Sequence, residues 1–302
     1  MRDAINQAQL TLQAERFLKR LKSRTTKWNG FYSQFTNLLL DFNTIYDPDF
    51  EYIGYLKFFV ILRYDLQEID SNYFDLKDEL KIFGYREIRA WLLDLSEDFE
   101  KDYITIEKQK NENRIEINKY CGLITDKYSR ILVARVDLSY FEQYSSQIMI
   151  DDIYNDLDIL LNRIQNKDGI FKYVIGHVWG IEQGGQSKGF HCHLAVIYDN
   201  AYRAGSAEYW GNKIIALWSD ITQGFGQGYN CWNRKRVAEL RSKGELGIGV
   251  IHRREPIEVS NFLRAMEYIT DHHKRTLQYL RVKPIGRRVF GKGQLRARHG
   301  RR

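Results

Sequence analysis

The spacing of apolar residues changes near residue 130, which restricts the chain to folds with a helical part followed by a strand-rich part. Up to about residue 125, apolar residues recur at intervals of three and four, as in INQAQLTLQAERFLKRLKS and REIRAWLLDLSEDFEKDY. Glycine follows the same division: four of the 22 glycines lie before residue 150, and fourteen fall between Gly169 and Gly249. We therefore expect a helical N-terminal region over residues 1–125.

The second part alternates strands and helices in a definite order. Strands are predicted over 131–137, 171–182, 190–198 and 247–253, and amphipathic helices over 149–165, 207–221 and 257–274. The middle two strands are joined by QGGQSKG, a hairpin loop by its glycines. The order β-α-β-β-α-β-α is typical of a split β-α-β, RNA-recognition-like domain with an antiparallel sheet. We expect an α+β chain with this domain over 126–280 and a basic C-terminal arm over 281–302.

The composition is that of a folded cytoplasmic protein. Hydrophobic residues make up 43% of the chain, and the longest apolar run, near Phe58 to Leu62, is far shorter than the ~20 residues of a membrane span. No hydrophobic leader with a cleavage site is apparent, and three widely spaced cysteines do not form a disulfide framework. No membrane partner is expected. The sequence also lacks a GxxxxGK[ST] phosphate loop, so ATPase or helicase activity is not predicted.

Positive charge is concentrated at the C-terminus. Residues 274–302 contain eleven Lys and Arg and no acidic residue. Because the net charge of the chain is +7, the other 273 residues have a net charge of −4. Such a segment, with Tyr279 and Phe290 among its cations, is typical of a nucleic-acid-binding arm. A solvated tail without a partner is the alternative. The candidate DNA-binding residues are Lys274, Arg275, Arg281, Lys283, Arg287, Arg288 and Lys292.

A candidate metal site lies in the strand FHCHLAVIY. Alternation along a strand gives one wholly apolar face, which includes Cys192, and an opposite face that begins with His191 and His193. Two imidazoles on one face could supply half of the ligands of a metal site. The alternative is that the two histidines have only a structural role. Glu182, across the hairpin, is the favoured third ligand, because His177 would lie about 13 Å further along the strand.

This ligand set suits Mg²⁺ or Mn²⁺ with positions left for phosphate oxygens. A zinc site that includes Cys192 is disfavoured because that side chain points to the other face. On the first strand, Arg135 and Asp137 share one face, either as a surface ion pair or as part of the site.

A candidate nucleophile lies in the last predicted helix. Phe262, Leu263, Met266 and Ile269 form its apolar stripe, whereas Tyr268 falls on a polar stripe with Asp271, His272 and Arg275. A tyrosine among titratable groups, on a helix that leads into a basic segment, could attack a DNA phosphate. An ordinary tyrosine at the edge of the core is the alternative.

Together these residues resemble the HUH endonucleases, which include rolling-circle replication initiators and relaxases. FHCHLAVIY is similar to their His-hydrophobic-His motif. The order of the segments is most similar to that of the inovirus-type initiators of filamentous phages, prophages and plasmids. RILVARVDL comes first, GHVWGIEQGGQSKGFHCHLAVIYD follows, and a helix with EYITDHHK comes last. The resemblance covers residues 126–292.

The resemblance implies that Glu182, His191 and His193 hold a divalent metal and that Tyr268 is the catalytic residue. Tyr268 would attack single-stranded or melted origin DNA and leave a 5′-phosphotyrosine and a free 3′-hydroxyl. A host helicase and polymerase would be partners in the bacterial cytoplasm. The chain departs from the family where a lysine usually follows the tyrosine by three or four residues, because Asp271 and His272 stand there.

Three other interpretations of these residues stay open. Tyr279 is a second candidate nucleophile. The chain could also be a non-catalytic module that binds single-stranded nucleic acid, or a small-molecule metallohydrolase, although the last leaves the basic C-terminus without a role.

Overall fold

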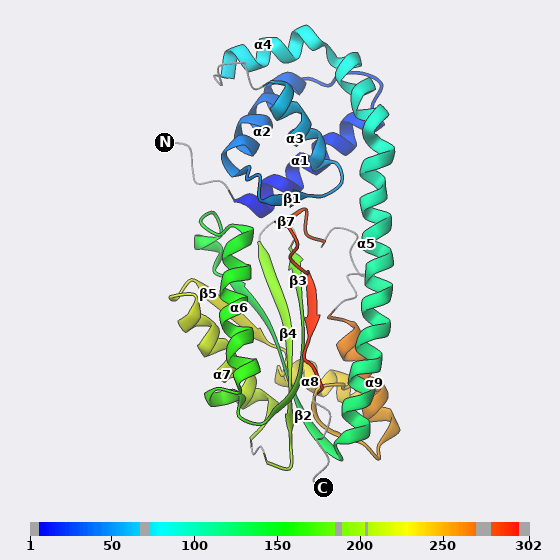
Figure 1. Cartoon of the computed structure of the whole chain (residues 1–302), viewed down its shortest axis with the longest axis vertical. Helices are drawn as coiled ribbons and strands as arrows, with labels where there is room; N and C mark the ends of the chain where they lie inside the picture. Colours follow the sequence, from blue (N-terminus) through cyan, green and yellow to red (C-terminus); the bar gives the residue numbers. More distant parts are fainter. Residues whose placement is uncertain (1–5, 67–72, 185–188, 203–204, 270–278, 296–302) are drawn as a thin grey trace.

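The N-terminal region is helical, as the spacing of its apolar residues predicts. The computed structural model describes residues 6–66, 73–184, 189–202, 205–269 and 279–295. Four helices pack around an aromatic core at one end of the molecule (Figure 1): α1 (Gln7–Ser23), α2 (Phe31–Ile45), α3 (Leu56–Asp65) and α4 (Tyr73–Phe83). The 43-residue α5 (Tyr85–Lys127) then runs about 65 Å, at 1.5 Å per residue, alongside both the helices and the sheet.

The second part is built on one antiparallel sheet. Its strands are β2 (Arg130–Tyr140), β3 (Val174–Gln183), β4 (Phe190–Asp199), β5 (Gly226–Asn230), β6 (Gly249–His252) and β8 (Phe290–Lys292). The order is β5-β2-β4-β3-β8, and β6 pairs with β2 beyond the end of β5. The α+β class and the antiparallel sheet are therefore confirmed.

Helices cover both faces of this sheet. α6 (Ile150–Asn166) and α7 (Ala207–Ile221) pack on one face, and α9 (Pro256–Glu267) packs with α5 on the other. α8 (Arg234–Ser242) follows β5, and two short 3₁₀ turns are formed by Glu142–Tyr144 and Gly169–Phe171. Because side chains alternate along β4, Leu194 and Val196 join the core under α6 and α7, whereas Ala195 and Ile197 face α5 and α9. His191 and His193 continue the second face.

The C-terminal segment differs from the expected free arm. Two short strands within it belong to the fold: β7 (Val282–Pro284) pairs with β1 (Phe50–Tyr52) of the N-terminal region, and β8 pairs with β3. Residues 281–292 therefore connect the helical region to the main sheet (Figure 1). Of the predicted arm, residues 296–302 lie outside the described residues.

Other elements also differ from the sequence expectation. β5 and α8 were not predicted, because the glycine-rich GQGYN has low strand propensity and RKRVAELRS has little apolar periodicity. α9 ends at Glu267 rather than continuing to residue 274. Tyr268 is thus the residue that caps the helix, and residues 270–278 lie outside the described part of the chain. Among the described helices, none combines the length and the apolar character that crossing a membrane requires.

Candidate metal centre

The hairpin of β3 and β4 brings the three predicted ligands together. In the antiparallel register, Glu182 pairs with His191 and Gly180 pairs with His193. Directly paired residues share a face, so the carboxylate of Glu182 lies on the same side of the sheet as both imidazoles. The site is held by the backbone ladder of two central strands, which fixes the separation of its side chains.

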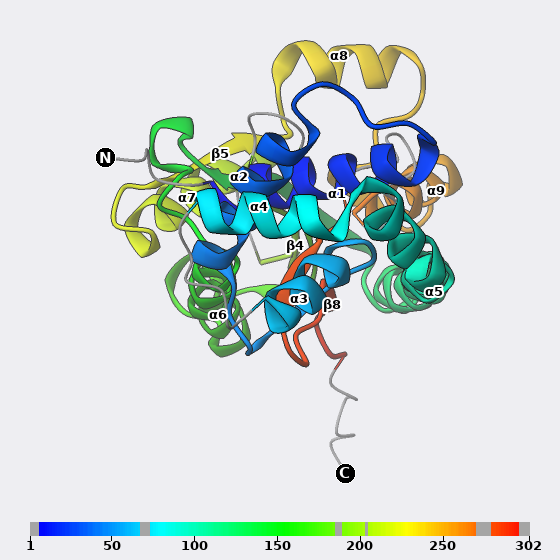
Figure 2. The ribbon, with the colours of Figure 1, turned by 90° about the horizontal axis from the view of Figure 1, so that it is seen from above.

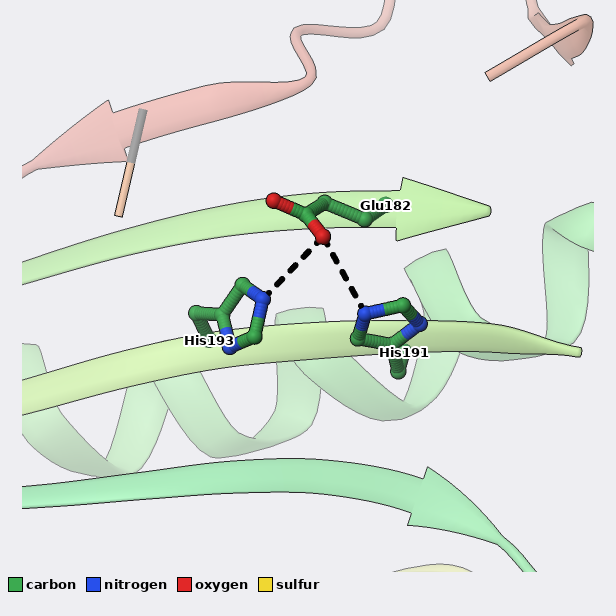
Figure 3. A group of neighbouring side chains, drawn as sticks. All are labelled: Glu182, His191 and His193. Atoms are coloured by element: carbon green, nitrogen blue, oxygen red, sulfur yellow. Dashed lines mark ion pairs between the residues drawn. The ribbon is translucent and has the colours of Figure 1, made fainter. Parts of the chain in front are cut away.

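Both imidazole rings turn toward one carboxylate oxygen (Figure 3). The Nε2 atoms of His191 and His193 each lie 3.2 Å from Oε2 of Glu182. All three residues are buried, with 3% of Glu182 and 8% of each histidine exposed. One ligand atom from each residue falls within 4.8 Å of the others. This convergence confirms that the trio predicted from the sequence is a cluster that could hold a metal ion.

Asp137 of β2 fixes the orientation of one ligand. It pairs with His193 in the sheet, and its Oδ1 lies 2.5 Å from Nδ1 of His193. A carboxylate that accepts the Nδ1 proton leaves Nε2 as the nitrogen directed at the cluster, which is a common arrangement behind histidine ligands. Asp137 is therefore part of the site and not only a partner of Arg135, whose guanidinium lies 3.8 Å away.

The carboxylates also set the charge of His193. Burial lowers the pKa of His193, but hydrogen bonds to Asp137 and Glu182 outweigh it and raise the pKa to about 9. Burial likewise raises the pKa of Asp137, yet the hydrogen bond and charge of His193 bring it below its usual value. In the metal-free protein, His193 is therefore a cation between two carboxylates.

The donor set fits a divalent ion. Two imidazole nitrogens and one carboxylate oxygen would leave further coordination positions for water or phosphate oxygens. The Nδ1 atom of His191, in contrast to that of His193, is buried and has no hydrogen-bond partner among the described residues. The protein therefore orients His191 through Nε2 and Glu182, without a carboxylate behind Nδ1 of the kind that Asp137 provides for His193.

The two rejected ligands lie elsewhere. The register pairs His177 with Val196 rather than with either histidine, and burial lowers the pKa of His177 to about 4. Cys192 is fully buried in the core under α6 and α7. The preference for Glu182 over both residues agrees with the geometry.

Tyr268 lies on the face of the sheet that carries the metal cluster. Gly180 follows the same alternation as Glu182, and a Cβ atom at Gly180 would lie 2.6 Å from the carbonyl oxygen of Ile269. The chain after α9 therefore rests on β3 at Gly180, two residues along the strand from Glu182. The Tyr268 ring is 44% exposed, and the guanidinium carbon of Arg135 lies 4.8 Å from its centroid. Arg135 thus lies between Tyr268 and Asp137.

Tyr279, the second candidate nucleophile, contacts residues of the N-terminal region. The hydroxyl of Tyr279 donates a hydrogen bond to the buried carboxylate of Glu15, and the Tyr279 ring packs edge-on against Tyr103. Burial and the charge of Glu15 raise the pKa of Tyr279 above its usual value. Ionisation of its hydroxyl for attack is therefore disfavoured.

The predicted DNA-binding cations of the C-terminal segment mostly form ion pairs within the protein. Arg281 is fully buried with its Nε 2.7 Å from Oε2 of Glu15, so the prediction that it contacts DNA is wrong. Arg287 binds Asp158 through two hydrogen bonds. The remaining pairs are Lys283 with Glu51 and Lys292 with Glu116. Arg288 is exposed, and Lys274 and Arg275 lie outside the described residues.

Sequence reasoning missed two features near the site. The sequence leaves open whether Arg135 forms a surface ion pair or belongs to the site, and it does not predict the approach of Arg135 to Tyr268, which depends on how α9 ends. The exposed cations of α8 were also missed, although RKRVAELRS preceded by the capping residue Asn233 is a recognisable charged helix.

A scan of protein-family models, a search of curated proteins and a search of solved structures each find no match to this chain. The function is therefore argued from its own residues.

Proposed function

We propose that this protein is a tyrosine-linked endonuclease for single-stranded or melted origin DNA, of the HUH type that initiates rolling-circle replication. One observation carries the proposal: a buried His-His-Glu cluster and an exposed tyrosine lie on the same face of one sheet, linked through Asp137 and Arg135. A metal cluster alone fits many hydrolases. A tyrosine beside it supplies the nucleophile that a covalent DNA intermediate needs.

The reaction follows from these groups. The hydroxyl oxygen of Tyr268 forms a bond to phosphorus, and the bond between phosphorus and the 3′ oxygen breaks. The phenolic proton leaves, the 3′ oxygen gains a proton, and the DNA 5′ end remains on the tyrosine. A divalent ion such as Mg²⁺ or Mn²⁺ at the cluster would supply polarisation of the scissile phosphate. The burial of Glu182, His191 and His193 keeps bulk water from the ligand atoms.

Arg135 fills the role that the missing lysine leaves open. Its guanidinium lies 4.8 Å from the Tyr268 ring centroid and 3.8 Å from Asp137, with a side chain that is 12% exposed. A guanidinium presents several donors to phosphate oxygens and stays charged at any working pH. Arg135 is thus placed to stabilise negative charge on the phosphate under attack.

The products define the partners of the reaction. A free 3′-hydroxyl is a primer, so a host polymerase would extend it. The sequence has no phosphate loop, so a host helicase would separate the strands. The protein would work in the cytoplasm of the bacterial host of a phage, prophage or plasmid.

A covalent-adduct assay tests the proposal. The protein is incubated with Mn²⁺ and labelled single-stranded DNA fragments that tile the region around its own coding sequence, and a protein–DNA band that survives denaturation is sought. We expect this band from the wild type and from Tyr279→Phe, and its loss in Tyr268→Phe and His191→Ala.

Each other outcome has a defined meaning. Loss of the band only in Tyr279→Phe would move the nucleophile away from the cluster. If the protein binds these fragments without forming a band, the nicking proposal fails and the non-catalytic binding module replaces it.

A further inference from the structure

A cluster of exposed cations lies on α8, where Arg236 is the member that pairs with Glu239 of the same helix. This nine-residue helix carries Arg234, Lys235, Arg236 and Arg241 against the single acidic residue Glu239, and all five side chains are exposed. In contrast, most described cations of the C-terminal segment neutralise carboxylates of other elements. α8 lies at the periphery of the molecule, as the view from above shows (Figure 2).

A hollow of about 540 Å³ opens beside the start of α8. Its lining combines two aromatic rings, side-chain amides and two cations: Tyr229, Trp232, Asn212, Asn233, Arg234 and Lys235. Its acidic lining residue, Glu208, has a carboxylate oxygen 3.7 Å from Nε of Arg234. Aromatic faces next to cations and amides are the chemistry of sites that hold an unpaired nucleobase with its phosphate.

Tyr229 places one edge of the hollow in the same row of the sheet as the metal cluster. Tyr229 of β5 pairs with Asp137 of β2, and Asp137 pairs with His193 of β4. Side chains of directly paired residues lie on one face, so Tyr229 stands on the same face as the cluster, about 10 Å from His193 at the spacing of strands. Its ring is 52% exposed at this edge, although tyrosine rings are often buried against neighbouring elements.

We propose that the hollow between α7, β5 and α8 is the entry site for single-stranded DNA. One base stacks on Tyr229, the phosphates beside it contact Arg234 and Lys235, and the strand continues across Asp137 toward the metal cluster and Tyr268. The inference rests on the proposed function for the identity of the ligand. It differs from that function in assigning the binding surface to α8 and β5 rather than to the C-terminal segment.

A binding measurement tests the site apart from cleavage. Fluorescence anisotropy of a 5′-fluorescein-labelled (dT)₂₀ strand is recorded in EDTA on a Tyr268→Phe background, so that no nicking contributes. We expect Tyr229→Ala to weaken binding by about tenfold, since stacking on an aromatic side chain contributes strongly per base. Arg234→Ala/Lys235→Ala should also reduce the slope of log affinity against log salt by about 1.4, or ~0.7 for each phosphate that is no longer neutralised.

Matched variants control for charge and for loss of an exposed ring. Arg86→Ala/Lys108→Ala removes one Arg and one Lys from exposed positions on α5, and Tyr202→Ala removes a ring that is 70% exposed. Both should bind as the background protein does, and circular dichroism of every variant should match it.

The outcomes separate this inference from the proposed function. If the background protein binds (dT)₂₀ and the α8 and Tyr229 variants bind equally well, the entry site is wrong while nicking can still be observed in the adduct assay. If Arg287→Ala/Lys292→Ala is the pair that lowers affinity and salt slope, the C-terminal segment is the binding surface. If (dT)₂₀ does not bind, the entry site is wrong, and the adduct assay with Mn²⁺ decides the proposed function separately.

Discussion

Truncation of Arg281 should destabilise the whole protein and not only weaken a DNA contact. Its guanidinium is fully buried, and its Nε lies 2.7 Å from Oε2 of Glu15, which is 1% exposed. In Arg281→Ala, Glu15 keeps hydrogen bonds from Tyr103 and Tyr279 and an ion pair with the exposed Lys19, but it loses the fully buried cation. Removing one partner of a buried pair costs about 3–5 kcal/mol, so we expect this decrease in the free energy of unfolding.

The matched control is Lys283→Ala, two residues further along the same segment. Its ion pair with Glu51 is partly exposed, and such pairs contribute about 0–1 kcal/mol. In thermal unfolding followed by circular dichroism, Arg281→Ala should lower the midpoint by at least about 6 °C, and Lys283→Ala by no more than about 2 °C. Equal, small shifts in both variants would refute the view that residues 279–292 are part of the core of the fold.

The pH dependence of stability gives a second readout of the same pair. Burial raises the pKa of Glu15, but Arg281, Lys19 and the two tyrosines together bring it below its usual value of 4.5. A carboxyl whose pKa is lowered by folding stabilises the protein above its unfolded pKa, and this contribution is lost as the pH falls through the folded value. Glu15→Gln should therefore flatten the decline in stability below about pH 4.5, whereas an unchanged acid profile would contradict the assignment.

Three further results are expected at the metal cluster. Asp137→Asn should weaken Mn²⁺ binding by about 10–100-fold in isothermal titration calorimetry, because it removes the acceptor that orients His193. Mn²⁺ binding at pH 7.5 should release about one proton, measured in buffers of different ionisation enthalpy, and this release should decline as the pH rises through the His193 pKa of about 9. Gly180→Ala should keep Mn²⁺ binding but reduce adduct formation on the order of 100-fold, because its methyl group would displace the carbonyl of Ile269 and with it Tyr268. The control is Gly122→Ala, whose methyl group would meet no atom within 4 Å.

These results have clear contrary outcomes. Unchanged Mn²⁺ affinity in Asp137→Asn would show that His193 does not need its carboxylate partner. Absence of proton release would mean that His193 is already neutral in the metal-free protein. Normal adduct formation by Gly180→Ala would show that the chain after α9 does not depend on its close approach to β3.

The metal cluster was predictable from the sequence because its geometry is local. His191 and His193 are two residues apart on one strand, so alternation alone places them on one face, and a short hairpin limits which residue can oppose them. Glu182 then follows from the register. Asp137 was harder to assign, since its strand pairs with β4 across a long connection whose register the sequence does not state.

The C-terminal segment was misjudged because composition describes charge but not partners. Eleven basic residues without an acidic neighbour resemble a phosphate-binding arm, yet their carboxylate partners lie far away in the sequence, as Glu15 does for Arg281 and Asp158 for Arg287. Long-range ion pairs of this kind leave no local pattern. The short strands β7 and β8 form for the same reason, through pairing with β1 and β3 rather than through their own propensity.

The most direct test of the central claim is to locate the DNA on the protein. The adduct formed with Mn²⁺ and its single-stranded substrate is digested with nuclease and trypsin, and the peptide that retains nucleotide mass is identified by tandem mass spectrometry. We predict a phosphodiester-linked nucleotide on Tyr268, absent when His193 is replaced by Ala. Nucleotide mass on Tyr279 or on any other residue, with Tyr268 unmodified, would contradict the account.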